Sequence, residues 1–199
     1  MKKAKKALLL ALCAVLLVAG SVMGTLAYLT ATDNITNTFT VGNVAIELKE
    51  RKMNAETGAL AEGSELVDEI SDIKVVPGRT IYKQPVVFVE SGSEDCWLFV
   101  KVEGKLLGGG SFAVNENWEA VEGQDNWYRY TANKGRAVAN AEGYQVFDSF
   151  TFHDLTNDQV EALDKGTIKV TAYAIQYELV DQAAAFAAAQ DMADSASNS

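Results

Sequence analysis

The sequence contains few of the residue types on which most enzyme active sites depend. Its 199 residues include one histidine, His153, and two cysteines, Cys13 and Cys96. Zinc hydrolases usually have three protein ligands, most often histidines, and the motif His-Glu-x-x-His does not occur. A serine triad would have to use His153, and no Gly-x-Ser-x-Gly turn is present. We therefore expect no enzyme activity, no cofactor and no bound metal.

Three weaker possibilities for chemistry involve carboxylates. His153 could join the acidic residues that follow it, although a solvated histidine beside a helix start is favoured; these residues are Asp154, Asp158 and Glu161. Asp68, Glu69 and Asp72 could bind calcium, but they lack the ligand spacing and the glycine of a calcium loop. A carboxylate pair for sugar hydrolysis is conceivable in so acidic a chain, yet no pair stands out from the others.

Basic residues are scarce relative to acidic ones, at 17 against 27. Four of the basic residues (Lys2, Lys3, Lys5 and Lys6) and none of the acidic ones lie before residue 28. The chain from residue 28 therefore has 13 basic and 27 acidic residues and a formal charge of −14. Such a chain repels phosphate backbones, which argues against nucleic-acid binding and favours solubility outside the cell.

The N-terminal lysines precede an uncharged apolar run from Ala7 to Ala19, which is the layout of a secretory signal peptide. The run is too short to span a bilayer comfortably, so a leader that is never cut and anchors the protein is the less favoured alternative. Thr25 and Ala27 fit the small-x-small rule of signal peptidase. Cleavage after Ala27 would make Tyr28 the new N-terminus of a secreted protein, with membrane contact only through the precursor's leader.

Cleavage would also remove Cys13 and leave Cys96 as the only cysteine, so no intramolecular disulfide is expected. Cys96 precedes an alternating apolar segment. A small buried apolar side chain is the simplest interpretation, and an intermolecular disulfide is the alternative.

Short apolar segments separated by glycine, proline and asparagine predict an antiparallel β-sandwich. Both faces of the last and longest segment are apolar, which indicates a central strand covered on each side. The segments 80–90 and 96–103 are expected to form a hairpin. The predicted strands are 38–48, with a bulge at Gly42-Asn43, and 80–90, 96–103, 127–130, 144–152 and 167–179.

Other parts of the chain are predicted to be helical or irregular. A capping box and a hydrophobic staple predict a helix over 157–163. Residues 50–72 are expected to be a surface excursion, 182–194 an alanine-rich helix and 195–199 disordered. The predicted parts are a signal peptide (1–27), an extended segment (28–37), a sandwich domain (38–181), and an alanine-rich helix with a disordered tail (182–199).

Three ordered blocks of the sequence resemble the TasA/camelysin family of secreted Gram-positive proteins. The first joins Gly24–Thr30 to Asn37–Val44, the second runs from Val76 to Val102, and the third is Ile168–Gln176. Residues 50–73 and 104–165 match no pattern of the family that we can identify. The resemblance implies a jelly-roll fold with helical decorations and cleavage by a SipW-type signal peptidase. Camelysin-type members have been described as metalloproteases, which the presence of only one histidine here does not favour.

The resemblance to TasA also implies a homo-polymer, a structural subunit of extracellular matrix or cell-surface fibres, with other matrix proteins or polysaccharide as further partners. An open sheet edge can accept a strand from another molecule. The residues after the cleavage point form a candidate donor strand that includes Tyr28, Leu29 and Ile35. The alternative is that this segment folds back as the first strand of its own domain.

A second hypothesis is a monomeric secreted module that binds carbohydrate or another surface. Aromatic rings stack on sugar faces, and four aromatic residues lie close together in the sequence: Trp118, Trp127, Tyr128 and Tyr130. Exposure of these side chains would favour a binding platform, and burial would assign them to the core.

Overall fold

A computed structural model of the protein describes residues 30–34, 37–39, 44–54, 56–60, 65–68 and 73–197. These residues are mainly β, in antiparallel sheets, with two α-helices: α2 (Asn157–Leu163) and α3 (Gln182–Ser197). Within these ranges no helix is both long and apolar enough to cross a membrane. The predicted leader, its cleavage residues Thr25, Ala27 and Tyr28, and Leu29 and Ile35 lie outside the described residues.

The largest sheet has seven strands and contains the longest strands of the protein. Its order is β2 (Asn37–Phe39), β1 (Thr30–Asn34), β14 (Lys169–Gln176), β7 (Cys96–Glu103), β10 (Trp127–Tyr130) and β9 (Trp118–Ala120), with β11 (Arg136–Ala137) also paired to β7. β14 pairs with β7 along its whole length, from Lys169 opposite Glu103 to Gln176 opposite Cys96. The prediction of a central strand is confirmed for Lys169–Gln176, because β14 lies between β1 and β7 and is buried from Val170 to Ile175. The last three residues of the predicted strand, 177–179, form a 3₁₀ helix instead.

The described residues also form two smaller sheets. The four-stranded sheet has the order β12 (Tyr144–Gln145), β6 (Pro85–Val89), β3 (Ile46–Arg51) and β4 (Leu66–Val67). The three-stranded sheet has the order β5 (Thr80–Tyr82), β13 (Ser149–Phe152) and β8 (Gly110–Ser111). Short 3₁₀ helices follow three of the strands: η1 (Lys105–Gly109), η2 (Ala132–Gly135) and η3 (Tyr177–Leu179).

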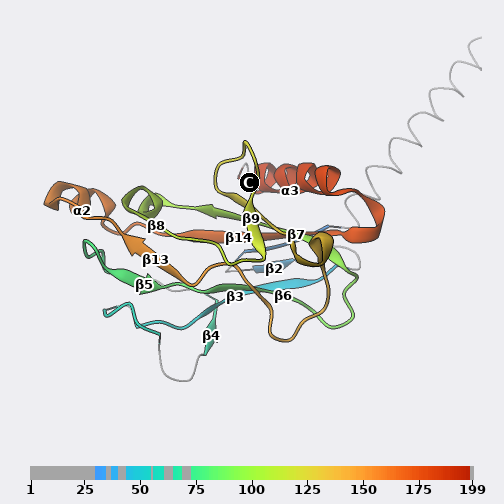
Figure 1. Cartoon of the computed structure of the whole chain (residues 1–199), viewed down its shortest axis with the longest axis horizontal. Helices are drawn as coiled ribbons and strands as arrows, with labels where there is room; N and C mark the ends of the chain where they lie inside the picture. The colour runs from blue at the N-terminus through green and yellow to red at the C-terminus, as the bar shows by residue number, and fades with distance from the viewer. Residues whose placement is uncertain are drawn as a thin grey trace, which may run out of the picture.

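The elements are arranged in layers around two apolar cores. Figure 1 shows α3 over one face of β14 and β7, with β3 and β6 beneath the opposite face. The larger core lies between the sheets and takes alternate residues from both sides, such as Val100 and Ala172 opposite Ile46 and Val87. The smaller core lies beneath α3, where Ala185, Ala189 and Ala193 pack on the large sheet.

Each of three predicted strands is divided in the structure into two strands, and these two belong to different sheets. The segment 38–48 contains the end of β2 in the seven-stranded sheet and the start of β3 in the four-stranded sheet. Segment 80–90 is divided into β5 and β6, and segment 144–152 into β12 and β13. The predicted hairpin of 80–90 with 96–103 is therefore wrong, since β6 pairs with β3 and β12 whereas β7 pairs with β14, β10 and β11.

The predicted helices are present. Thr156 Oγ1 accepts a hydrogen bond from the Gln159 N–H at 3.4 Å, and the Gln159 side chain accepts one from the Thr156 N–H at 2.9 Å, which confirms the capping box of α2. The alanine-rich helix α3 continues to Ser197, three residues into the segment that we expected to be disordered. The hydroxyls of Ser195 and Ser197 donate to carbonyls one turn earlier and so remain within the helix.

Candidate functional site

One side of the seven-stranded sheet brings together the segment after the predicted cleavage point and β14, a strand that is buried from Val170 to Ile175. β1 begins at Thr30 and pairs with β14 over five residues, from Thr30 opposite Ile175 to Asn34 opposite Thr171. β2 then folds back on β1, with Asn37 opposite Asn34. The chain therefore places β1 on its own β14, as the fold-back alternative expected.

The β14 strand is well suited to receive another strand. Its side chains alternate between the two cores: Ala172 and Ala174 belong to the larger core, and Tyr173 and Ile175 to the core beneath α3. β7 covers one long edge of β14, and β1 covers the other. Without β1, a row of backbone N–H and C=O groups would lie open between two apolar layers, which is the form of an acceptor edge.

The four residues of the proposed aromatic platform do not form one exposed surface. Trp118 is 4% exposed and Trp127 is 5% exposed. Trp127 packs beneath α3, against Tyr173 and Phe186, whereas Trp118, Tyr128 and Tyr130 pack on the opposite face with the larger core. Partial burial raises the pKa of both tyrosine hydroxyls. The exposure that a sugar-binding platform requires is therefore absent at both tryptophans.

Cys96 is fully buried at the start of β7. Burial, together with the negative charge of Asp95, raises the pKa of the thiol from 9.0 to about 12. Because the folded environment disfavours the thiolate, the buried thiol stabilises the folded state relative to the unfolded chain. This stabilisation is complete below pH 9.0 and is lost as the pH rises through the pKa of the folded state, about 12. The side chain fits the interpretation of a small buried apolar residue and is not presented for an intermolecular disulfide.

We expect Cys96 of the folded protein to react very slowly with a maleimide. At pH 8 the thiolate fraction is about 1,000-fold smaller at a pKa of 12 than at a pKa of 9.0. The measurement compares the labelling rates of the folded chain that begins at Tyr28, in which Cys96 is the only cysteine, and of the same chain in concentrated urea, both at pH 8. Equal rates, or a disulfide-linked dimer on a non-reducing gel, would contradict this assignment.

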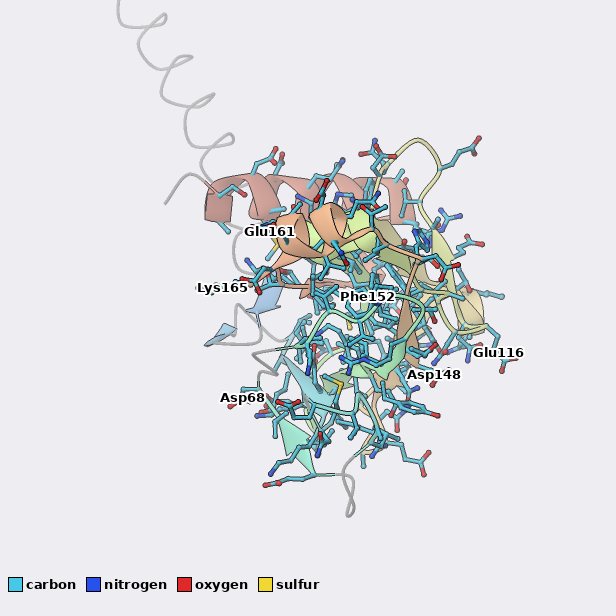
Figure 2. All side chains as sticks on the ribbon, turned by 90° about the vertical axis from the view of Figure 1, so that its left-hand side faces the viewer. Asp68, Glu116, Asp148, Phe152, Glu161 and Lys165 are labelled. Carbon is cyan, nitrogen blue, oxygen red and sulfur yellow. The ribbon has the colours of Figure 1, made fainter. Side chains whose placement is uncertain are left out.

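The described carboxylates do not gather into a metal site. His153, Asp154, Asp158 and Glu161 are all exposed, and no group of three histidine, cysteine, aspartate or glutamate residues in the described ranges could hold a metal ion. Figure 2 shows the labelled residues Asp68, Glu116 and Glu161 at separate places, with Asp68 and Glu116 toward opposite sides of the view and Glu161 on the helix that faces the viewer.

The candidate calcium cluster is described only at Asp68, because Glu69 and Asp72 lie outside the described residues. The Asp68 carboxylate accepts a hydrogen bond from the Lys49 ammonium. This bond and a second one to Glu47 raise the pKa of Lys49. Asp68 therefore takes part in a surface ion pair between β3 and the residues after β4.

A buried ion pair is the site that the sequence analysis missed. Glu50 is 0% exposed and Lys83 is 2% exposed, and Lys83 Nζ donates to Glu50 Oε1. We had placed Glu50 at the start of an exposed excursion, but it is the fifth residue of β3. The missed signal is the two-residue alternation of a strand, in which every second side chain points to the same face. Glu50 continues the inward series of Ile46 and Leu48. Lys83 likewise comes two residues after the buried Ile81.

No protein-family model, curated protein or solved structure matches this chain. We therefore infer its function from its residues and their geometry.

Proposed function

We propose that this protein is a secreted structural subunit of extracellular matrix or cell-surface fibres, whose subunits join by β-strand addition after residues 1–27 are removed. The resemblance of three sequence blocks to the TasA/camelysin family suggests this function, and a jelly-roll-like β-sandwich is the corresponding fold. A SipW-type signal peptidase is the processing partner, and further copies of the chain are the principal binding partners.

The observation that carries this proposal is the pairing of β1 with β14. Residues 30–34 are threonine, alanine, threonine, aspartate and asparagine, which offer little apolar surface, so their attachment to β14 depends mainly on the backbone ladder. A ladder of this kind is the same whether the strand comes from the same chain or from a neighbour. The β1 strand of one subunit can therefore occupy the β14 edge of the next in the same register.

Cleavage is the step that permits this exchange. Thr30 is the third residue after Ala27, so the leader is joined almost directly to β1. While the leader is held in the membrane, β1 cannot move freely to another subunit. After cleavage at Tyr28, the strand has a free end, and the strongly acidic chain is released into an environment where it stays soluble until strands pair.

The test is electron microscopy of the purified chain that begins at Tyr28, compared with a chain that retains several leader residues ahead of Tyr28. We expect fibres from the first chain and dispersed particles from the second. Dispersed particles from both chains would overturn the proposal and favour the monomeric binding module. Fibres from both chains would support strand addition but would contradict the proposal that cleavage controls assembly.

A further inference from the structure

The buried pair of Glu50 and Lys83 has no counterpart elsewhere in the described part of the chain, where these are the only charged side chains that are buried. Glu50 lies near the end of β3, and Lys83 lies between β5 and β6, where the chain passes from the three-stranded to the four-stranded sheet. The pair therefore joins two segments that are 33 residues apart in the sequence.

The surroundings of this pair exclude water. On β3, Glu50 lies opposite Val67 of β4 and Pro85 of β6, in line with the fully buried Leu48. Lys83 follows Ile81, which is 0% exposed. The side-chain amide Nε2 of the adjacent Gln84 donates a hydrogen bond to Asp148 Oδ1 at 3.5 Å. Burying two unit charges in such an environment is costly even when they are paired.

One atom of the pair is unsatisfied. Oε1 of Glu50 accepts from Lys83, but Oε2 is buried and has no hydrogen-bond partner within the described residues. A carboxylate oxygen with this burial usually has at least one donor. The ion pair is therefore incompletely hydrogen-bonded within the described residues.

From this geometry we propose that Lys83 and Glu50 condense spontaneously in the folded protein to form an isopeptide bond between Nζ and Cδ. One proton passes from the ammonium to the carboxylate, which leaves an amine and a carboxylic acid. The nitrogen lone pair attacks Cδ, and the C–N bond forms. The C–Oε2 bond then breaks, and Oε2 leaves as water with two of the three ammonium protons. No oxidant, reductant or other reactant takes part.

Three features of the site favour this product. The amine and the carboxyl group are held in contact by the fold, and intramolecular reactions of well-placed groups reach effective concentrations on the order of 10⁵ to 10⁸ M. The apolar surroundings disfavour buried charges, and the reaction removes both of them. It also removes Oε2, the oxygen without a partner, while Oε1 remains as the carbonyl of the new amide.

The bond would fasten the central strand of the four-stranded sheet to the corner between β5 and β6. Residues 50–83 would then form a closed covalent loop that includes β4 and β5. The inference is independent of fibre formation, since it concerns groups inside one subunit.

The test is the intact mass of the folded chain that begins at Tyr28. We expect a mass lower by one water than the sequence requires, and a tryptic digest in which the peptides of Glu50 and Lys83 are recovered as one branched peptide, uncut after Lys83. The same chain, isolated and kept in denaturant from the time of synthesis, should have the full sequence mass and lose one water only after refolding.

Two variants sharpen the result. Lys83→Met has no amine to react and should keep its full mass. Glu50→Gln should yield the same cross-linked product by losing ammonia in place of water, although more slowly. The proposal is overturned if the folded wild-type chain has its full sequence mass with the two peptides recovered separately, or if a loss of water maps to other residues.

Discussion

Thr32→Pro is expected to abolish fibre formation by the chain that begins at Tyr28 while leaving the domain folded. Thr32 lies in the middle of β1, opposite Tyr173 of β14 and Phe39 of β2. Because β1 has a strand on each side, the N–H of residue 32 faces one of them whichever way it points. Proline removes that N–H and does not fit the interior of a sheet. Electron microscopy should show no fibres, and circular dichroism should still show β structure.

The matched control is Thr32→Val, which keeps the N–H and has a high preference for strands. Its fibres should form at least as readily as those of the wild type. Fibres of normal length from the proline variant would contradict strand donation by β1. Loss of the β signal from the proline monomer would show that β1 is needed within its own domain, which also argues against donation.

Gly104→Ala is expected to lower the free energy of unfolding by about 3–5 kcal/mol, because it combines an unfavourable backbone angle with a clash. Gly104 has φ 133° and ψ 160°, a region that only glycine adopts readily. An added Cβ would lie 2.1 Å from the Thr167 carbonyl oxygen, just before β14. Backbone atoms in both segments would have to move, and they flank the longest strand pair of the protein.

Gly92→Ala separates the two effects. Gly92 also has a positive φ, 88°, but an added Cβ meets nothing within 4 Å. Only the backbone angle is then unfavourable, and a loss of about 1 kcal/mol is expected. Urea unfolding of the wild type and both variants gives the comparison. Equal losses for the two variants would mean that the approach of Thr167 to Gly104 does not contribute.

Local features of the fold could be predicted from the sequence. The capping box of α2 involves residues three positions apart, and the two apolar faces of β14 are visible in its own sequence. Neither depends on which strand lies beside which. The mainly β character and the alanine-rich helix could also be predicted, since composition and turn residues indicate them.

Long-range features could not be predicted in the same way. The apolar pattern of 80–90 is interrupted at Lys83-Gln84-Pro85, but such an interruption does not show that the strands before and after it belong to different sheets. Glu50 lies just beyond the predicted strand 38–48 and Lys83 lies within the predicted strand 80–90, so their pairing is not visible in either segment alone. A charged residue in phase with inward apolar residues predicts burial, but its partner becomes known only when the strands are placed side by side.

The position of β14 has a consequence for the order in which the molecule can fold. β14 comes late in the chain, yet its neighbours are β1, near the start of the described residues, and β7, near the middle. The large sheet therefore cannot close until the chain has been synthesised as far as Gln176. Contacts of such high sequence separation slow folding. A central strand that comes so late keeps the large sheet open until most of the chain is present, which is the order that the proposed secretion requires.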